Sequence, residues 1–134
     1  MPQDPYLLVI ADDHLMFRQG LKKNLEEKPF IKVIGEAANG LDLLRLVDNL
    51  TPHLVILDIS MPKLRGIEAA ARIKSVKPQI KILILSMHRE REYLEQAISS
   101  GADGYLLKED AFTELFEAID TLMKGGSYFS SSAR

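Results

Sequence analysis

Short hydrophobic runs alternate along the chain with segments whose apolar residues recur at helical spacing. Five runs rich in aliphatic residues cover positions 6–11, 31–37, 53–58, 80–86 and 104–108. The first, third and fourth runs are almost continuously apolar, which is typical of strands covered on both faces of a parallel sheet. The second and fifth runs are shorter or more mixed, so we expect them at the edges of the sheet.

The segments between these runs carry signals of helix starts and ends. Asn39 suits the N-cap of the second segment, and Pro52 prevents that helix from continuing past Thr51. We expect the third helix over residues 66–76, and Gly101 suits the C-cap of the fourth. Five strands that alternate with five helices predict a doubly wound (βα)5 domain of the α/β class, because parallel strands need crossovers and helices supply them.

Length and composition indicate one ordinary globular domain. The chain has 134 residues, of which 46% are apolar and 27% charged, and these values argue against disorder. We expect an N-terminal tail over 1–5, one domain over 6–124, and a linker without further strands or helices over 125–134. Aliphatic runs such as Leu7 to Ala11 and Ile82 to Leu85 reach only four or five residues, whereas a membrane span needs about 20. The start, MPQDP, has no signal-peptide pattern, so we expect a soluble, cytoplasmic protein without membrane association.

Charge and cysteine content exclude several classes of function. The formal net charge is −2, without the basic surplus of an autonomous nucleic-acid binder. The chain has no cysteine, which excludes a disulfide scaffold, a Cys-ligated zinc site and thiol catalysis.

Polar side chains end four of the five predicted strands. They are the pair Asp12 and Asp13 after the first strand, Asp58 on the third, Ser86 on the fourth and Lys108 on the fifth. Because ligands of open α/β sheets bind beyond the carboxyl ends of the strands, we expect these side chains to converge.

This group of side chains has a definite chemistry. Three carboxylates in one crevice repel one another unless a cation lies between them, and carboxylates without cysteine or clustered histidine suit Mg²⁺. Two carboxylates can hold the metal while the third attacks phosphorus, and a lysine can pair with the phosphoryl group. The pattern therefore predicts phosphoryl transfer onto an aspartate.

Each of these residues also has a simpler interpretation. Asp13 suits the N-cap of the first helix, Ser86 could be an ordinary strand-end hydroxyl, and Lys108 could be a surface lysine. A cap explains neither Asp12 nor Asp58, whose sequence neighbours are apolar. The three histidines lack the spacing of metal ligands, and we expect them to be structural or solvated: His14, His53 and His88.

Four stretches of the sequence resemble the receiver domain of two-component response regulators. They are ADDH at 11–14, LDISMP at 57–62, LS at 85–86 and GADGYLLK at 101–108, and the resemblance covers about residues 6–124. The details resemble the NarL/FixJ-type subfamily, whose members usually carry a LuxR-like helix-turn-helix domain after a short linker. The resemblance implies a flavodoxin-like fold with a parallel five-stranded sheet in the order 2-1-3-4-5.

The same resemblance implies a role for each residue at the acidic site. Asp58 would accept a phosphoryl group from a sensor histidine kinase. A Mg²⁺ or Mn²⁺ ion would be held by Asp12, Asp13, Asp58 and the backbone carbonyl of Ser60. The protein would then be a signalling switch that catalyses its own phosphoryl transfer and autodephosphorylation, and not an enzyme with a separate substrate.

The resemblance further implies how the switch works. Ser86 and Lys108 would bind the phosphoryl group, and Ser86 would move inward and vacate space that Tyr105 fills. This movement would remodel the face made by the fourth helix, the fifth strand and the fifth helix, and it would promote a homodimer. DNA would be bound only through an output domain that this chain lacks, and the switch would regulate transcription.

Three other functions fit parts of the pattern. A haloacid-dehalogenase-type phosphatase also uses a strand-end aspartate, but it needs a general-acid aspartate where this chain has Ser60, and a cap domain for which there is no room. A flavin-binding module would need a Ser/Thr-Gly-rich phosphate loop where this chain has two acids. A binding-only pseudo-receiver is disfavoured because every acidic-site residue is present.

Overall fold

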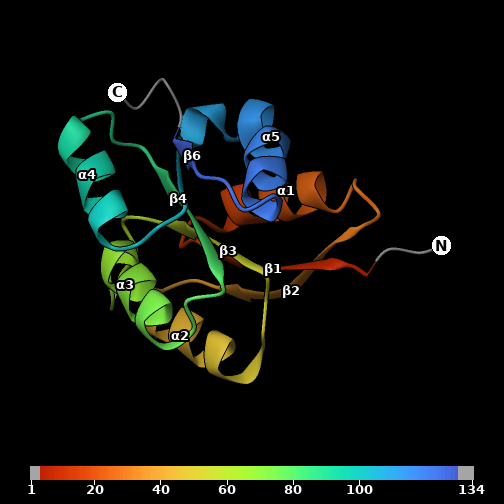
Figure 1. The fold of residues 1–134 in the computed structure, drawn as a ribbon, viewed down its shortest axis with the longest axis horizontal. Coiled ribbons are helices and arrows are strands. Elements are labelled where there is room, and N and C mark those ends of the chain that lie inside the picture. Colours follow the sequence, from red (N-terminus) through yellow and green to blue (C-terminus); the bar gives the residue numbers. More distant parts are fainter. Residues whose placement is uncertain (1–3, 130–134) are drawn as a thin grey trace.

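A six-stranded parallel sheet with helices on both faces forms the molecule, in a computed structural model that describes residues 4–129 (Figure 1). The strands are β1 (Tyr6–Ala11), β2 (Ile31–Ala37), β3 (Leu54–Asp58), β4 (Lys81–Ser86), β5 (Gly104–Leu107) and β6 (Tyr128–Phe129). The helices are α1 (Leu15–Leu25), α2 (Gly40–Asn49), α3 (Gly66–Val76), α4 (Arg91–Ser99) and α5 (Ala111–Met123), with a 3-10 turn η1 (Lys108–Asp110) before α5. The order is β2-β1-β3-β4-β5-β6, so the expected α/β fold and its strand order 2-1-3-4-5 are confirmed.

Two hydrophobic clusters hold the layers together. Helices α1 and α5 cover one face of the sheet and α2, α3 and α4 cover the other (Figure 1). Alternate residues of the central strands enter opposite clusters: Leu54 and Ile56 of β3 face α1 and α5, while Val55 and Leu57 face the other layer. Both faces are therefore buried, which explains why the sequence of β3 is continuously apolar.

The helix caps follow the sequence signals. The Asn39 side chain accepts a hydrogen bond from the backbone N–H of Asp42 at 2.9 Å and so caps α2. Gly101 has φ +91° just after α4, a conformation that glycine adopts without steric cost. Helix α3 has the predicted bounds.

The sixth strand corrects the expectation that no element follows α5. Tyr128 pairs with Gly104 and Phe129 with Tyr105, so β6 covers the outer side of β5, which we expected at the edge. A Cβ atom at Gly104 would lie 2.9 Å from the Tyr128 carbonyl oxygen, so glycine lets β6 approach. A strand of only two residues has no periodic pattern, which is why sequence reasoning missed β6. The rest of the predicted linker, 130–134, and residues 1–3 of the predicted tail lie outside the described residues.

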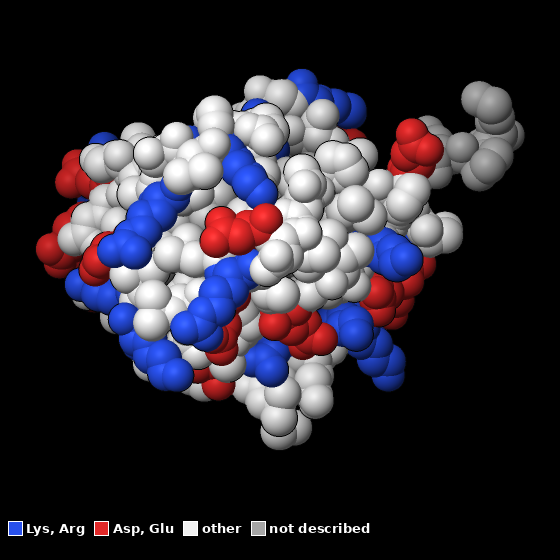
Figure 2. All heavy atoms as spheres, turned by 90° about the horizontal axis from the view of Figure 1, so that it is seen from below, with Lys and Arg blue, Asp and Glu red and all other residues white. Residues whose placement is uncertain are grey.

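Surface charge and helix length add two observations. On the face shown in Figure 2, basic and acidic side chains are interspersed, in keeping with the small net charge. None of the helices within residues 4–129 has the length and apolar character needed to cross a membrane.

Candidate functional site

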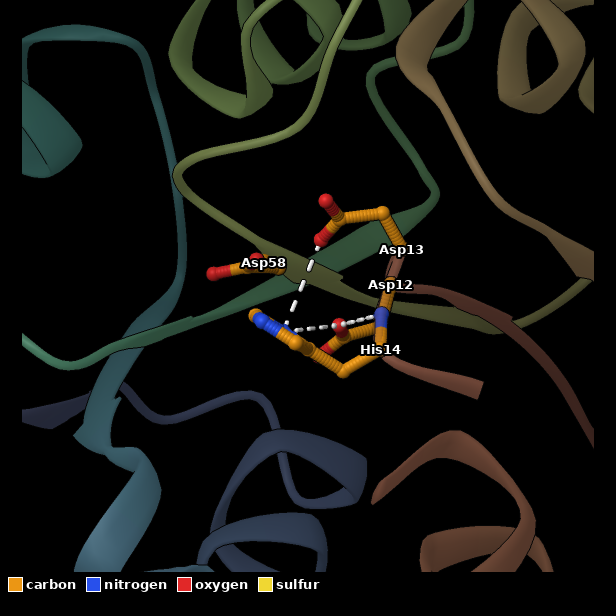
Figure 3. A group of neighbouring side chains, drawn as sticks. All are labelled: Asp12, Asp13, His14 and Asp58. Atoms are coloured by element: carbon orange, nitrogen blue, oxygen red, sulfur yellow. Dashed lines mark hydrogen bonds and ion pairs between the residues drawn. The ribbon is translucent and has the colours of Figure 1, made fainter. Parts of the chain in front are cut away.

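Strand register brings the predicted polar side chains to one rim of the sheet. Ala11 of β1 pairs with Leu57 of β3, so the next residue of each strand, Asp12 and Asp58, lies at the same level. Figure 3 shows Asp58 beside the loop that carries Asp12, Asp13 and His14. Asp12 and Asp58 are almost fully buried, with 1% and 2% of their surfaces exposed. The convergence predicted from the strand ends is therefore present for these carboxylates.

Lys108 is the cation of this site. Its Nζ lies 2.7 Å from Asp12 Oδ2 and 3.4 Å from Asp58 Oδ2, and only 9% of its side chain is exposed. The ammonium also lies 4.7 Å from the centroid of the Phe17 ring, where the face of the ring attracts a cation. Lys108 is therefore a buried member of the acidic site, and the interpretation as an ordinary surface lysine is wrong.

One ammonium does not balance the carboxylates around it. Burial raises the pKa of the Asp58 carboxyl; the Lys108 ammonium lowers it, and the Asp12 carboxylate raises it further. Asp12 Oδ2 and Asp58 Oδ2 are buried beside Lys108, but neither accepts a well-formed hydrogen bond from any residue in 4–129. The site is thus short of positive charge.

This imbalance predicts that Asp58→Asn stabilises the metal-free protein. Because the folded-state pKa of Asp58 is raised, wild-type stability falls as the pH rises from the unfolded-state pKa through the folded-state pKa. The variant lacks this loss and should melt roughly 3–6 °C higher at neutral pH, as about 1 kcal/mol would give. The difference should shrink as the pH falls and should vanish below the unfolded-state pKa of about 3.9, where the carboxyl is protonated in both states.

Thermal unfolding with a chelator across this pH range measures the effect. Asp13→Asn is the control, because the Asp13 side chain is 35% exposed and should change the melting temperature less. If the melting temperature of the wild type at neutral pH equals or exceeds that of Asp58→Asn, the repulsion among the buried carboxylates does not destabilise the protein, and the prediction is wrong.

The turn after β1 differs from the expectation. Asp13 does not cap α1; the N-cap residue is His14, whose side chain makes no cap hydrogen bond. Instead Asp12 Oδ1 accepts a hydrogen bond from the backbone N–H of His14 at 2.8 Å. The Asp12 carboxylate therefore uses one oxygen to fix the turn and presents the other to Lys108.

Sequence reasoning missed His14. Its Nδ1 lies 3.2 Å from Asp12 Oδ1, 3.5 Å from Asp13 Oδ1 and 3.2 Å from Lys108 Nζ. One ligand atom each from Asp12, Asp13, His14 and Asp58 lie within 4.8 Å of one another, which suits a metal ion. The sequence did place this histidine directly after the two acids. The orientation of its side chain, however, depends on the turn that Asp12 fixes.

Ser86 and Tyr105 meet at the backbone of His88. Ser86 is fully buried, and its Oγ accepts a hydrogen bond from the His88 N–H at 2.9 Å. Tyr105 is also fully buried, and its hydroxyl donates to the His88 carbonyl oxygen at 2.9 Å. Both side chains are thus bonded to the loop after β4, and their roles in switching stay predictions.

Ser60 follows Asp58 by two residues, and its backbone opposes the rise of the Asp58 pKa. Its exposed side-chain Oγ lies 3.5 Å from His88 Nε2. A ligand role for the Ser60 carbonyl stays a prediction.

A pocket of about 490 Å³ opens beside these groups and gives a small molecule access to the rim. Its lining residues are His14, Phe17, Ser86, Met87, Lys108 and Glu109. Lys108 and Ser86 thus border one opening beside the buried carboxylates.

Comparisons with known proteins agree on one family. The sequence profile of the response regulator receiver domain matches residues 8–120. The chain is 37% identical over 121 residues to the transcriptional regulatory protein DegU of Brevibacillus brevis, covering 90% of this chain and 51% of that protein. It is 33% identical over 130 residues to the nitrate/nitrite response regulator NarL of Escherichia coli K12, covering 97% and 60%. The chain thus spans little more than half the length of these relatives.

Solved structures show the same similarity in three dimensions. A LuxR-family two-component response regulator from Aurantimonas sp. SI85-9A1 is 31% identical and matches with a TM-score of 0.92, over 97% of this chain and 93% of that one. The isolated receiver domain of RcsB from Salmonella enterica serovar Typhimurium, solved with the phosphomimetic BeF3⁻, is 30% identical with a TM-score of 0.89, over 97% and 96%.

Proposed function

The chain belongs to the response regulator receiver domain family, with NarL/LuxR-family transcription regulators as its relatives, and from this membership we propose that Asp58 accepts a phosphoryl group from a histidine kinase. A receiver domain is a signalling switch and not a classical enzyme, so the result of the reaction is the phosphorylated domain itself. The observation that carries the proposal is the placement of Lys108 between the buried carboxylates of Asp12 and Asp58.

Asp58 supplies the nucleophile. One of its carboxylate oxygens forms a bond to phosphorus while the bond between phosphorus and the donor's leaving atom breaks, giving an acyl phosphate. Lys108 Nζ, 3.4 Å from Asp58 Oδ2, is close enough to pair with the phosphoryl oxygens that arrive there. Ser86, on the wall of the same pocket, supplies a hydroxyl that can donate to one of those oxygens.

The donor set fits the Mg²⁺ or Mn²⁺ that receiver chemistry uses. We assign Asp12, Asp13, Asp58 and the backbone carbonyl of Ser60 as the residues that would hold it. The buried Oδ2 atoms of Asp12 and Asp58, which lack well-formed hydrogen bonds from residues 4–129, support this assignment. A bound dication would supply positive charge that reduces the repulsion between the anionic reactants, and oxygen ligands are those that Mg²⁺ prefers.

Incubation with Mg²⁺ and a small acyl phosphate tests the proposed reaction. Intact mass should show the addition of one phosphoryl group, which EDTA prevents. Asp58→Asn should not be labelled, because an amide cannot form the acyl phosphate. Asp48→Asn, which removes an exposed carboxylate from α2, is the matched control and should be labelled like the wild type. Unchanged labelling of Asp58→Asn would contradict the assignment of Asp58.

The role of the following chain is also a proposal. We propose that the residues after β6 begin a linker to an output domain that binds DNA, since the matched parts of this chain cover only 51% and 60% of the two relatives. A solved structure of an RcsB protein, 30% identical to this chain, is described as two RcsB dimers bound to two parallel DNAs. By analogy, phosphorylation here would favour a homodimer that positions two output domains.

We propose the face of α4, β5 and α5 as the surface that changes. Tyr105 lies on β5, and its hydroxyl donates a hydrogen bond to His88 in the loop between β4 and α4. Strand β6 runs along the outer side of β5, where Phe129 packs with the cluster that contains Tyr105. Any partner that docks on this face therefore meets β6 as well as the two helices.

A further inference from the structure

We propose that His14 is a fourth side-chain ligand of the metal site and that it shifts the preference of the site from Mg²⁺ toward transition-metal dications. This inference rests on the metal site of the proposed function, but it needs no phosphoryl transfer. It concerns which ion the site selects, and it assigns a role to a residue that the three carboxylates leave unexplained.

The position of the imidazole carries the inference. Figure 3 shows the His14 ring turned over the acidic group, in contact with Asp12 and Asp13. Nδ1 lies 3.2 Å from Asp12 Oδ1 and 3.5 Å from Asp13 Oδ1. Two ligand atoms that each lie about 2.1 Å from one octahedral ion are about 3 Å apart. The three atoms are thus spaced as neighbouring ligands of one dication are.

The tautomer of the ring decides which neighbour Nδ1 bonds. Nδ1 lies 3.2 Å from Lys108 Nζ, which only donates, and 3.2 Å from Asp12 Oδ1, which only accepts. The tautomer whose Nδ1 lone pair faces the site is the one that can bind a metal. A lone pair beside two carboxylate oxygens is repelled unless a cation lies between them. Lys108 is the ammonium nearest the buried Oδ2 atoms of Asp12 and Asp58, at 2.7 Å and 3.4 Å, so one positive charge faces three carboxylates there.

The chemistry of an imidazole ligand gives the direction of the selectivity. Mg²⁺ prefers oxygen ligands and gains little from nitrogen, whereas affinity for imidazole-containing sites rises along the series from Mn²⁺ to Ni²⁺ and Cu²⁺. The His14 side chain is 60% exposed, so the ring can turn toward an ion without repacking the core. A site of carboxylates and a carbonyl alone would lack this nitrogen contribution.

Calorimetric titration of the metal-free protein with Ni²⁺ and with Mg²⁺ measures the selectivity. His14→Asn should weaken Ni²⁺ binding about tenfold or more and change Mg²⁺ binding by less than about twofold. His88→Asn is the matched control, because His88 lies near Ser60 but outside the four-residue group, and its ratio of affinities should equal that of the wild type. If His14→Asn loses affinity for Ni²⁺ and for Mg²⁺ equally, or loses affinity for neither, the proposal is overturned.

Pulsed electron paramagnetic resonance of bound Mn²⁺ gives a second readout. The wild type should show coupling to a directly bound nitrogen, and His14→Asn should not. Persistence of that coupling in the variant, or its absence in the wild type, would also overturn the role of His14. If instead neither Mg²⁺ nor Ni²⁺ binding responds to Asp13→Asn, the metal site of the proposed function fails, and the two failures are thereby distinguished.

Discussion

Asp13→Ala should weaken Mg²⁺ binding about 100-fold, whereas Lys108→Ala should bind Mg²⁺ at least as tightly as the wild type. The first variant removes one of the three carboxylates, and the affinity of such sites depends on the number of charged ligands. The second removes the ammonium that lies 2.7 Å from Asp12 Oδ2, so the metal no longer competes with a fixed cation. The two substitutions at one site should therefore have effects of opposite sign.

Intrinsic tyrosine fluorescence during a Mg²⁺ titration can follow both variants, because the chain has four tyrosines and no tryptophan. Lys124→Ala is the control for the loss of a lysine, since Lys124 is exposed and pairs with Asp120 at the end of α5. Similar losses of affinity in Asp13→Ala and Lys108→Ala would contradict the separate roles of ligand and phosphoryl-binding cation.

Ser86→Ala should accept the phosphoryl group on Asp58 but fail to dimerise in response. Ser86 Oγ now accepts from the His88 N–H, and Tyr105 donates to the carbonyl oxygen of the same residue. If the Ser86 hydroxyl turns to a phosphoryl oxygen, His88 loses one of these two contacts, and the loop that leads to α4 can rearrange. A hydrogen bond to a charged group contributes about 1.5–3 kcal/mol, so the phosphorylation-induced gain in dimer affinity should fall at least about tenfold.

Sedimentation with and without beryllofluoride measures the loss. Ser75→Ala, which removes an exposed hydroxyl from α3, is the matched control and should dimerise like the wild type. If Ser86→Ala and the wild type dimerise alike, Ser86 does not couple the site to the face of α4, β5 and α5. A population shift needs contacts made in one state alone, and another residue would then have to make them.

The positions of the carboxylates and of Lys108 could be predicted because they depend on strand ends. Continuous apolar runs locate the strands, and parallel strands bring their carboxyl ends to one rim. Asp12 and Asp58 meet there because Ala11 pairs with Leu57. Membership of the receiver family also sets aside the phosphatase and flavin-binding alternatives.

Other features depend on contacts that no local pattern shows. His14 faces the acids because Asp12 fixes the turn, and the sequence alone suggested Asp13 as the cap. Strand β6 forms because Gly104 leaves room for the Tyr128 backbone, a condition set far away in the sequence. The hydrogen bond from Tyr105 to the His88 backbone likewise joins residues that periodicity does not relate.

Chemical trapping of the phosphorylated protein tests the central claim most directly. An acyl phosphate is reduced by borohydride, which marks the carboxyl that carried the phosphoryl group, and peptide mass spectrometry then locates the mark. After treatment with Mg²⁺ and a small acyl phosphate, the mark should lie at Asp58 alone and should be absent when EDTA is present. A mark at Asp12 or Asp13, or a phosphoryl group found on His14, would contradict Asp58 as the phosphoryl acceptor.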